Sequence, residues 1–246
     1  MIDLTNLNDD CTDADIHKLC EQALATDQRP ATAAVCVWPA FVAQSKQALT
    51  DSGVLVATVV NFPKGGTDTA AVMVETEKVL EAGADEVDLV FPYEAWIAGD
   101  VTTATEQVEA IRALVQAPAK LKVIIETGEL ANEDLIREAS LMCIGQGVDF
   151  IKTSTGKVAE NATLESARIM LSAIAQAGGG TGGVCGFKPA GGIRTFDDAR
   201  DHLGLAASIM GEGWATPATY RFGASSLLGS VESVLIGGAA APVGGY

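Results

Sequence analysis

The sequence predicts an α/β protein whose strands and helices alternate to form a single (β/α)8 TIM barrel. Short apolar runs rich in β-branched residues recur eight times, and segments with helical periodicity separate them. Strands that are apolar at nearly every position are typical of a parallel sheet covered by helices. Eight strands close such a barrel, and the 246 residues of the chain suit one barrel domain.

The expected strands follow one another along the whole chain. The first run is short and terminal, so the alternative is an open doubly wound sheet if this run is not a strand. We expect the barrel to span residues 1–236, and the glycine- and alanine-rich segment 237–246 to be a flexible tail. The runs are 2–5 (IDLT), 33–37 (AAVCV), 54–60 (VLVATVV), 86–91 (EVDLVF), 121–126 (LKVIIE), 148–153 (VDFIKT), 184–188 (VCGFK) and 221–225 (RFGAS).

Several helical segments are preceded by a residue that can cap a helix N-terminus. Side-chain oxygens of Ser, Thr, Asp and Asn accept hydrogen bonds from the free N–H groups of the first turn. The expected caps are Thr12 or Asp13 for the first helix, Thr67 for the segment 68–83, Asn132 for 133–145 and Thr163 for 164–178.

The composition limits the classes of partner. A net charge of −16 and a sequence pI of about 4.4 argue against nucleic acid or an anionic membrane. No apolar run is long enough to span a bilayer and the first residues carry no signal-peptide pattern, so we expect a cytoplasmic protein. The five cysteines form no CxxC pair and there are two histidines, so we expect neither a metal nor a cofactor.

Two lysines, Lys152 and Lys188, lie within apolar strand runs. Because active sites of parallel barrels lie at the carboxyl ends of the strands, Asp3 and Asp88 are expected near them. One interpretation is a pair of structural salt bridges to these aspartates. The other is amine chemistry, because two close ammonium groups disfavour each other's charge. The amine that loses its proton can form a Schiff base with a carbonyl, while Asp88 moves protons.

Glycines and serines follow the last two expected strands. The loops after strands seven and eight of these barrels often hold phosphate through backbone N–H groups and a helix N-terminus. Gly191, Gly192 and Gly223 would let an anion approach the backbone, and Ser225 and Ser226 could add hydrogen-bond donors. The sequence therefore predicts a phosphorylated small molecule as ligand.

Six motifs together resemble the deoxyribose-phosphate aldolase family: VVNFPKG (59–65), EVDLVFPY (86–93), LKVIIETGEL (121–130), DFIKTSTGK (149–157), GFKPAGGIRT (186–195) and RFGASSLL (221–228). The resemblance implies a class I aldolase that reversibly cleaves 2-deoxy-D-ribose 5-phosphate to glyceraldehyde 3-phosphate and acetaldehyde. It implies that Lys152 forms the Schiff base, Lys188 perturbs it, Asp88 relays protons and Asp3 is a further polar member of the site. It also implies that the phosphate side includes Gly156 and that the terminal Tyr246 reaches the site.

Two alternatives use the same glycine loops. A phosphate-binding isomerase or epimerase would need a carboxylate or histidine base but no Schiff-base lysine. A non-catalytic sugar-phosphate binder would need only the loops. The expected partners are thus a small-molecule sugar phosphate and aldehydes, and the sequence leaves a homodimer open.

Overall fold

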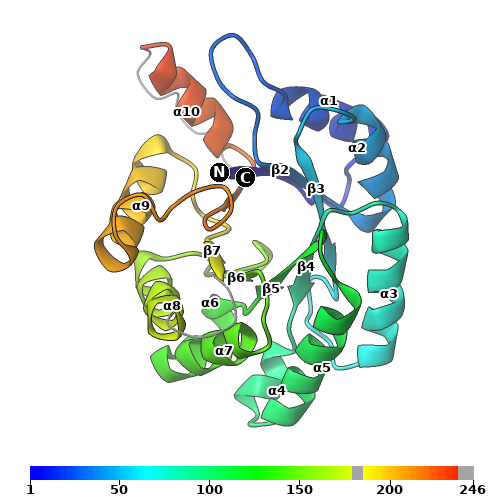
Figure 1. The fold of residues 1–246 in the computed structure, drawn as a ribbon, viewed down its shortest axis with the longest axis vertical. Helices are drawn as coiled ribbons and strands as arrows, with labels where there is room; N and C mark the ends of the chain where they lie inside the picture. Colours follow the sequence, from blue (N-terminus) through cyan, green and yellow to red (C-terminus); the bar gives the residue numbers. More distant parts are fainter. Residues whose placement is uncertain (179–184, 238–246) are drawn as a thin grey trace.

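The centre of the molecule is a closed ring of parallel strands surrounded by helices (Figure 1). The structure is a computed structural model that describes residues 1–178 and 185–237. Its eight strands run in the order β7-β6-β5-β4-β3-β2-β1-β8. They are β1 (Ile2–Asn6), β2 (Ala34–Val37), β3 (Leu55–Val60), β4 (Glu86–Val90), β5 (Lys120–Ile124), β6 (Phe150–Lys152), β7 (Gly186–Lys188) and β8 (Phe222–Ala224).

Backbone hydrogen bonds between the two ends of this order close the ring. Phe187 N donates to Thr219 O at 2.9 Å, and Gly223 N donates to Pro189 O at 2.9 Å. All eight expected strands form, including the short first one, whose partners are β2 and β8. The (β/α)8 barrel is therefore confirmed, and the open doubly wound sheet is wrong.

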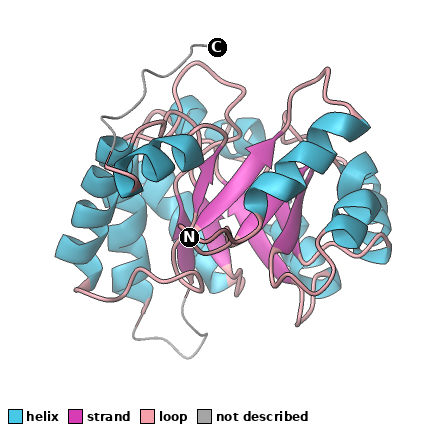
Figure 2. Ribbon diagram, turned by 90° about the horizontal axis from the view of Figure 1, so that it is seen from above, coloured by secondary structure: helices cyan, strands magenta, loops and turns pink. Residues whose placement is uncertain are grey.

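Helices surround the ring of strands in Figure 1, and the view from above in Figure 2 shows helices flanking the strands. None of the described helices is both long enough and apolar enough to cross a membrane. The helices are α1 (Asp13–Ala23), the 3-10 helix η1 (Pro39–Phe41), α2 (Val42–Ala48), α3 (Thr69–Glu81), α4 (Tyr93–Ile97), α5 (Val101–Leu114), α6 (Thr127–Leu130), α7 (Glu133–Gly145), α8 (Leu164–Ala177), α9 (Phe196–Met210) and α10 (Leu227–Leu235).

Three of the four expected helix caps are confirmed. The side chains of Thr12, Asn132 and Thr163 accept hydrogen bonds from the first turns of α1, α7 and α8. The expected cap Thr67 is wrong, because the carboxylate of Asp68 accepts the hydrogen bond from Ala71 N instead. A charged carboxylate at a helix N-terminus also interacts favourably with the helix dipole. The expected tail lies outside the described residues from position 238 onward.

The interior of the ring holds both apolar and charged side chains. On the side of β2 and β3 a small apolar cluster contains the buried Cys36, Ala57 and Val59. The other strands send charged side chains into the same interior. Unpaired charges cannot remain in a dry interior, so these groups must neutralise one another or change protonation. This requirement shapes the candidate site.

Candidate active site

The two lysines predicted from the sequence lie side by side at the carboxyl ends of their strands. Lys152 of β6 and Lys188 of β7 are partners in the strand register. Their Nζ atoms each lie 2.8 Å from the same oxygen, Oδ2 of Asp88 on β4. The Nζ of Lys188 also lies 2.7 Å from Oδ2 of Asp3 on β1. The expected group of Lys152, Lys188, Asp88 and Asp3 is thus brought together.

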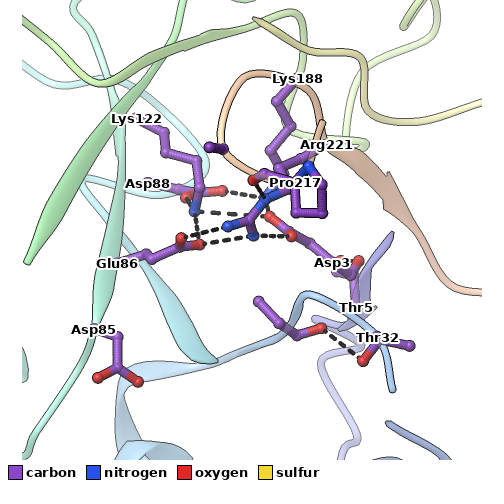
Figure 3. A network of polar contacts seen from close by, with 12 residues as sticks. Asp3, Thr5, Thr32, Asp85, Glu86, Asp88, Lys122, Lys188, Pro217 and Arg221 are labelled. Carbon is purple, nitrogen blue, oxygen red and sulfur yellow. Dashed lines mark hydrogen bonds and ion pairs between the residues drawn. The ribbon is translucent and has the colours of Figure 1, made fainter. Parts of the chain in front are cut away.

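These residues belong to a larger buried charge cluster, most of which Figure 3 shows. Lys122 of β5 lies 2.7 Å from Asp88 Oδ1 and 2.7 Å from Glu86 Oε2. Arg221 lies 2.7 Å from Asp3 Oδ1 and 3.0 Å from Glu86 Oε1. The cluster contains three carboxylates (Asp3, Glu86, Asp88) and four basic groups (Lys122, Lys152, Lys188, Arg221).

The ion pairs hold most of the cluster in its charged form. Burial alone would raise the pKa of Asp88, but Lys122, Lys152 and Lys188 outweigh it and hold that pKa well below its usual range. Burial likewise opposes the charge of Lys188, yet Asp3 and Asp88 raise the pKa of this amine. Asp88 and Glu86 raise the pKa of Lys122 in the same way, against the effect of burial.

Lys152 behaves differently from its neighbours. Burial lowers the pKa of its amine, repulsion from Lys188 adds to the effect, and the attraction of Asp88 does not cancel them. Burial is therefore a larger cause than the like charge on which the sequence argument rested. Its side chain lines a cavity of about 590 Å³. An amine that is neutral more readily and that reaches a cavity is suited to attack a carbonyl.

The glycine loops line the same cavity as Lys152. Gly156, Gly191, Gly192, Gly223, Ser225 and Ser226 all line it, as expected. At Gly191 the backbone has φ +78°, and an added Cβ would lie 2.8 Å from atoms of Asn161. At Gly223 a Cβ would lie 2.8 Å from that of Ala190 and 3.1 Å from Lys188 Cε. Both positions therefore require glycine, and both bring backbone to the cavity surface.

A helix begins directly after the two serines that line the cavity. Ser226 precedes the first residue of α10, and its hydroxyl makes no capping hydrogen bond. The free N–H groups of a first helical turn and the serine hydroxyls suit a phosphate group. Three cationic side chains that the sequence argument did not select, Lys18, Lys157 and Arg194, also line the cavity. Lys157 is held at the rim by an ion pair of 3.0 Å with Asp9.

Glu126 is a further buried acid beside the site. It follows β5 in the left-handed region, with φ 52°, and its carboxylate accepts a hydrogen bond of 3.2 Å from Thr155 N. Burial raises the pKa of this carboxyl, while Thr155 and Lys152 oppose the shift. Glu126 thus fixes the loop after β6, from which Thr155 and Gly156 reach the cavity.

Sequence reasoning missed part of the cluster. Lys122 stands within an apolar strand like the two selected lysines, and Glu86 lies two positions before Asp88 on the same strand face. The apolar strand around it could have identified Lys122, and period-two spacing from Asp88 could have identified Glu86. The salt bridges of the structural interpretation do exist, but they do not account for a cavity at Lys152. Tyr246 lies outside the described residues.

Comparison with known proteins agrees with this geometry. The sequence matches the family described as DeoC/LacD family aldolase over residues 1–230. It is 52% identical over 239 residues to a deoxyribose-phosphate aldolase of Agrobacterium fabrum (strain C58 / ATCC 33970), covering 97% of this chain and 90% of that protein.

Solved structures give the same result. A tetrameric deoxyribose phosphate aldolase from Aeropyrum pernix is 25% identical, with a TM-score of 0.76 and coverage of 95% of this chain and 88% of that one. The aldolase QR15 is 27% identical, with a TM-score of 0.78 and coverage of 96% of each chain. The resemblance inferred from the six motifs is confirmed, and the chain belongs to the DeoC/LacD family of aldolases.

Proposed function

We propose that Lys152 is the amine through which this aldolase reversibly cleaves 2-deoxy-D-ribose 5-phosphate into glyceraldehyde 3-phosphate and acetaldehyde. The observation that carries the proposal is the position of Lys152: among the four basic groups of the described cluster, it is the one that lines the cavity. Burial lowers its pKa while the pKa of its neighbour Lys188 is raised, so the two amines favour different protonation states. A neutral and a charged amine together supply a nucleophile and a proton source.

The chemistry follows from this pair. Neutral Nζ of Lys152 attacks the C1 aldehyde of the open-chain sugar, and loss of water gives a protonated imine. The imine accepts the electron pair of the C2–C3 bond as the C3 hydroxyl loses its proton, which releases glyceraldehyde 3-phosphate and leaves an enamine. Protonation of the enamine at C2 and hydrolysis release acetaldehyde and return the free amine.

Asp88 is suited to move protons in these steps. Its Oδ2 accepts hydrogen bonds of 2.8 Å from both Lys152 and Lys188, so it lies between the reacting amine and a charged donor. Asp3 then acts by holding Lys188 at 2.7 Å. Tyr246 is proposed, on the family resemblance, to donate or accept a proton when the enamine is protonated.

The glycines and serines that line the cavity are proposed to bind the phosphate of the substrate. Gly156 and Gly192 would present backbone N–H groups, and Ser225 and Ser226 would add hydroxyl donors. Gly191 and Gly223 donate their own N–H groups to Gly223 O and Pro189 O, so they would let the phosphate approach the backbone without donating to it. The side chains of Lys157 and Arg194 in the same cavity supply positive charge. This local charge offsets the repulsion of an anionic substrate by a chain of net charge −16, because distant surface charges are screened by salt.

The isomerase and the non-catalytic binder find no support in the family match, which is to aldolases. We further propose a cytoplasmic location, in line with five free cysteines and the acidic composition. A homodimer is proposed as the solution state. Light scattering on purified protein would reject it by giving the mass of a monomer or a larger oligomer.

The function is tested by release of acetaldehyde from 2-deoxy-D-ribose 5-phosphate. Wild-type protein should release it, and a folded Lys152→Ala protein should not. Lys46→Ala is a matched control, since Lys46 pairs with Asp85 at 2.8 Å, before the start of β4 and away from the cavity. Aldehyde release by Lys152→Ala at the rate of this control would overturn the assignment.

A further inference from the structure

A second layer of charge lies directly beneath the residues of the proposed mechanism. It consists of Glu86, Lys122 and Arg221, and in Figure 3 these side chains converge on Asp3 and Asp88. All three are buried, with 0% of Glu86, 0% of Lys122 and 2% of Arg221 exposed. The guanidinium is fixed further by a hydrogen bond to Pro217 O and by the Phe150 ring, whose centroid lies 5.7 Å away.

The four basic groups are not equally supported. Arg221 is shared between Asp3 and Glu86, and Lys122 between Glu86 and Asp88, with Asp3 Oδ2 also lying 3.7 Å from its Nζ. Lys188 is shared between Asp3 and Asp88. Among the described residues Lys152 pairs with one carboxylate oxygen, Asp88 Oδ2, and Lys188 uses that oxygen as well. When one basic group of the cluster is deprotonated, Lys152 is the group whose deprotonation removes the least favourable electrostatic interaction.

The charges of the ion-paired cluster do not balance. Its three carboxylates face four basic groups, so the cluster carries one excess positive charge when all four basic groups are protonated. Glu126 makes no ion pair with these groups, and burial raises the pKa of its carboxyl, so it offsets this charge less than a paired carboxylate would. Such a charge is costly when buried. Arg221 cannot relieve it, because a guanidinium stays protonated at every pH at which the protein is folded. Without Arg221 the cluster would be neutral with all three lysines protonated.

We propose that Arg221 and Glu86 are positioning residues that set the charge of the catalytic lysine: Arg221, by pairing with Asp3 and Glu86, makes Lys152 the excess cation of the cluster. The proposal rests on the assignment of Lys152 as the Schiff-base amine. It gives a catalytic consequence to two side chains that do not line the cavity.

Other groups that face Lys152 do not supply this effect. The Cys36 thiol of β2 is neutral over most of the pH range, because burial raises its pKa. Glu126 after β5 and Asp88 on β4 both attract the Lys152 proton and so work in the opposite direction. Lys188 repels the proton, but its own charge is held by Asp3, to which Arg221 also binds.

The experiment measures how fast acetaldehyde is trapped on Lys152 by cyanoborohydride, as a function of pH, with intact mass and peptide mapping as readouts. Arg221→Met removes the permanent cation and should move the acid limb of the profile to higher pH by about one unit. Glu86→Gln removes a carboxylate and should move the limb to lower pH. The double variant Glu86→Gln/Arg221→Met should return toward wild type, and Arg221→Lys, which keeps a cation, should stay near it.

A merely structural role would not produce shifts of opposite sign. Arg112→Met is the matched control. Arg112 pairs at 2.6 Å with Asp149, which precedes β6 at the other end of the barrel. The acid limb of the pH profile of this variant should therefore not move. Unmoved limbs in folded Arg221→Met and Glu86→Gln, or shifts of the same sign, would overturn the proposal. If Arg221→Met does not fold, Glu86→Gln decides alone: a limb at lower pH supports the proposal and an unmoved one refutes it.

The same data separate this inference from the proposed function. If acetaldehyde is trapped on Lys152 in the wild type but the acid limbs of the variants' pH profiles do not move, only the role of Arg221 and Glu86 is rejected. Absence of trapping on Lys152 in the wild type rejects the assignment of the Schiff-base lysine, and the inference falls with it.

Discussion

Replacing Lys188 by leucine should move the acid limb of the kcat/KM profile to higher pH. The Nζ atoms of Lys152 and Lys188 each lie 2.8 Å from Asp88 Oδ2, so they are separated by no more than twice that distance. At this separation, two unit charges repel by roughly 3 kcal/mol in a medium of effective dielectric about 20. Loss of that repulsion corresponds to a shift of about two pH units in the pKa of Lys152.

The direction follows from which form is favoured. Lys188 disfavours the charged form of Lys152, so its removal lets Lys152 keep its proton to higher pH, and Asp88 Oδ2 then serves Lys152 alone. Burial still opposes the charge, because leucine keeps the site apolar. On the acid limb, where the rate falls tenfold per pH unit, Lys188→Leu should therefore be slower by about 100-fold from this effect.

The assay is kcat/KM for cleavage of 2-deoxy-D-ribose 5-phosphate across the pH range in which the protein stays folded, monitored by circular dichroism. Lys46→Leu serves as control, because Lys46 is a partly exposed lysine paired with Asp85 away from the cavity. A folded Lys188→Leu protein whose acid limb stays within about half a pH unit of the control would refute the coupling of the two amines.

Four further predictions follow from the site. Lys152→Arg should lose cleavage to the assay background although charge is kept, because a guanidinium stays protonated. Gly191→Ala forces a Cβ to 2.8 Å from Asn161 at φ +78° and should raise KM roughly tenfold for the phosphorylated sugar but not for free 2-deoxyribose. The pKa of Asp3 is lowered by Lys188, Lys122 and Arg221 against the effect of burial. This stabilisation is present above the unfolded pKa of about 3.9 and is lost as pH falls toward the folded pKa. The free energy of unfolding in urea should therefore fall less below pH 5 for Asp3→Asn than for the wild type, by on the order of 1 kcal/mol. Tyr246→Phe should lower kcat by roughly 100-fold with unchanged melting temperature if the phenol carries a proton to the enamine, and wild-type turnover would reject that role.

The fold was predictable because every strand of a parallel barrel is buried on both faces. Apolar runs such as 54–60 therefore stand out from the amphipathic helices around them. The ends of the strands were less predictable: the run 148–153 yields a strand only at Phe150–Lys152, although Asp149 N and Thr153 N still donate hydrogen bonds to Leu121 O and Lys188 O on the neighbouring strands. The choice between Thr67 and Asp68 as helix cap depended on a turn that the residues alone do not specify.

The site was predictable where one residue contradicts its surroundings. A lysine within an apolar strand carries that signal, and so Lys152 and Lys188 were found, although Lys122 carries the same signal and was not selected. Glu86 and Arg221 were missed because each stands at or just before the first position of its strand, where a charged residue is ordinary. The strand register, which pairs Asp88 with Lys122 across β4 and β5, shows that charges of neighbouring strands meet inside the barrel.

Lys152 is proposed to form the covalent intermediate. The most direct measurement is reduction of the protein with borohydride in the presence of acetaldehyde, followed by intact mass and peptide mapping. We expect one added ethyl group per chain, located on Lys152 and absent from Lys152→Ala. An ethyl group found on Lys188 or Lys122 instead, or no added mass in an active preparation, would contradict it.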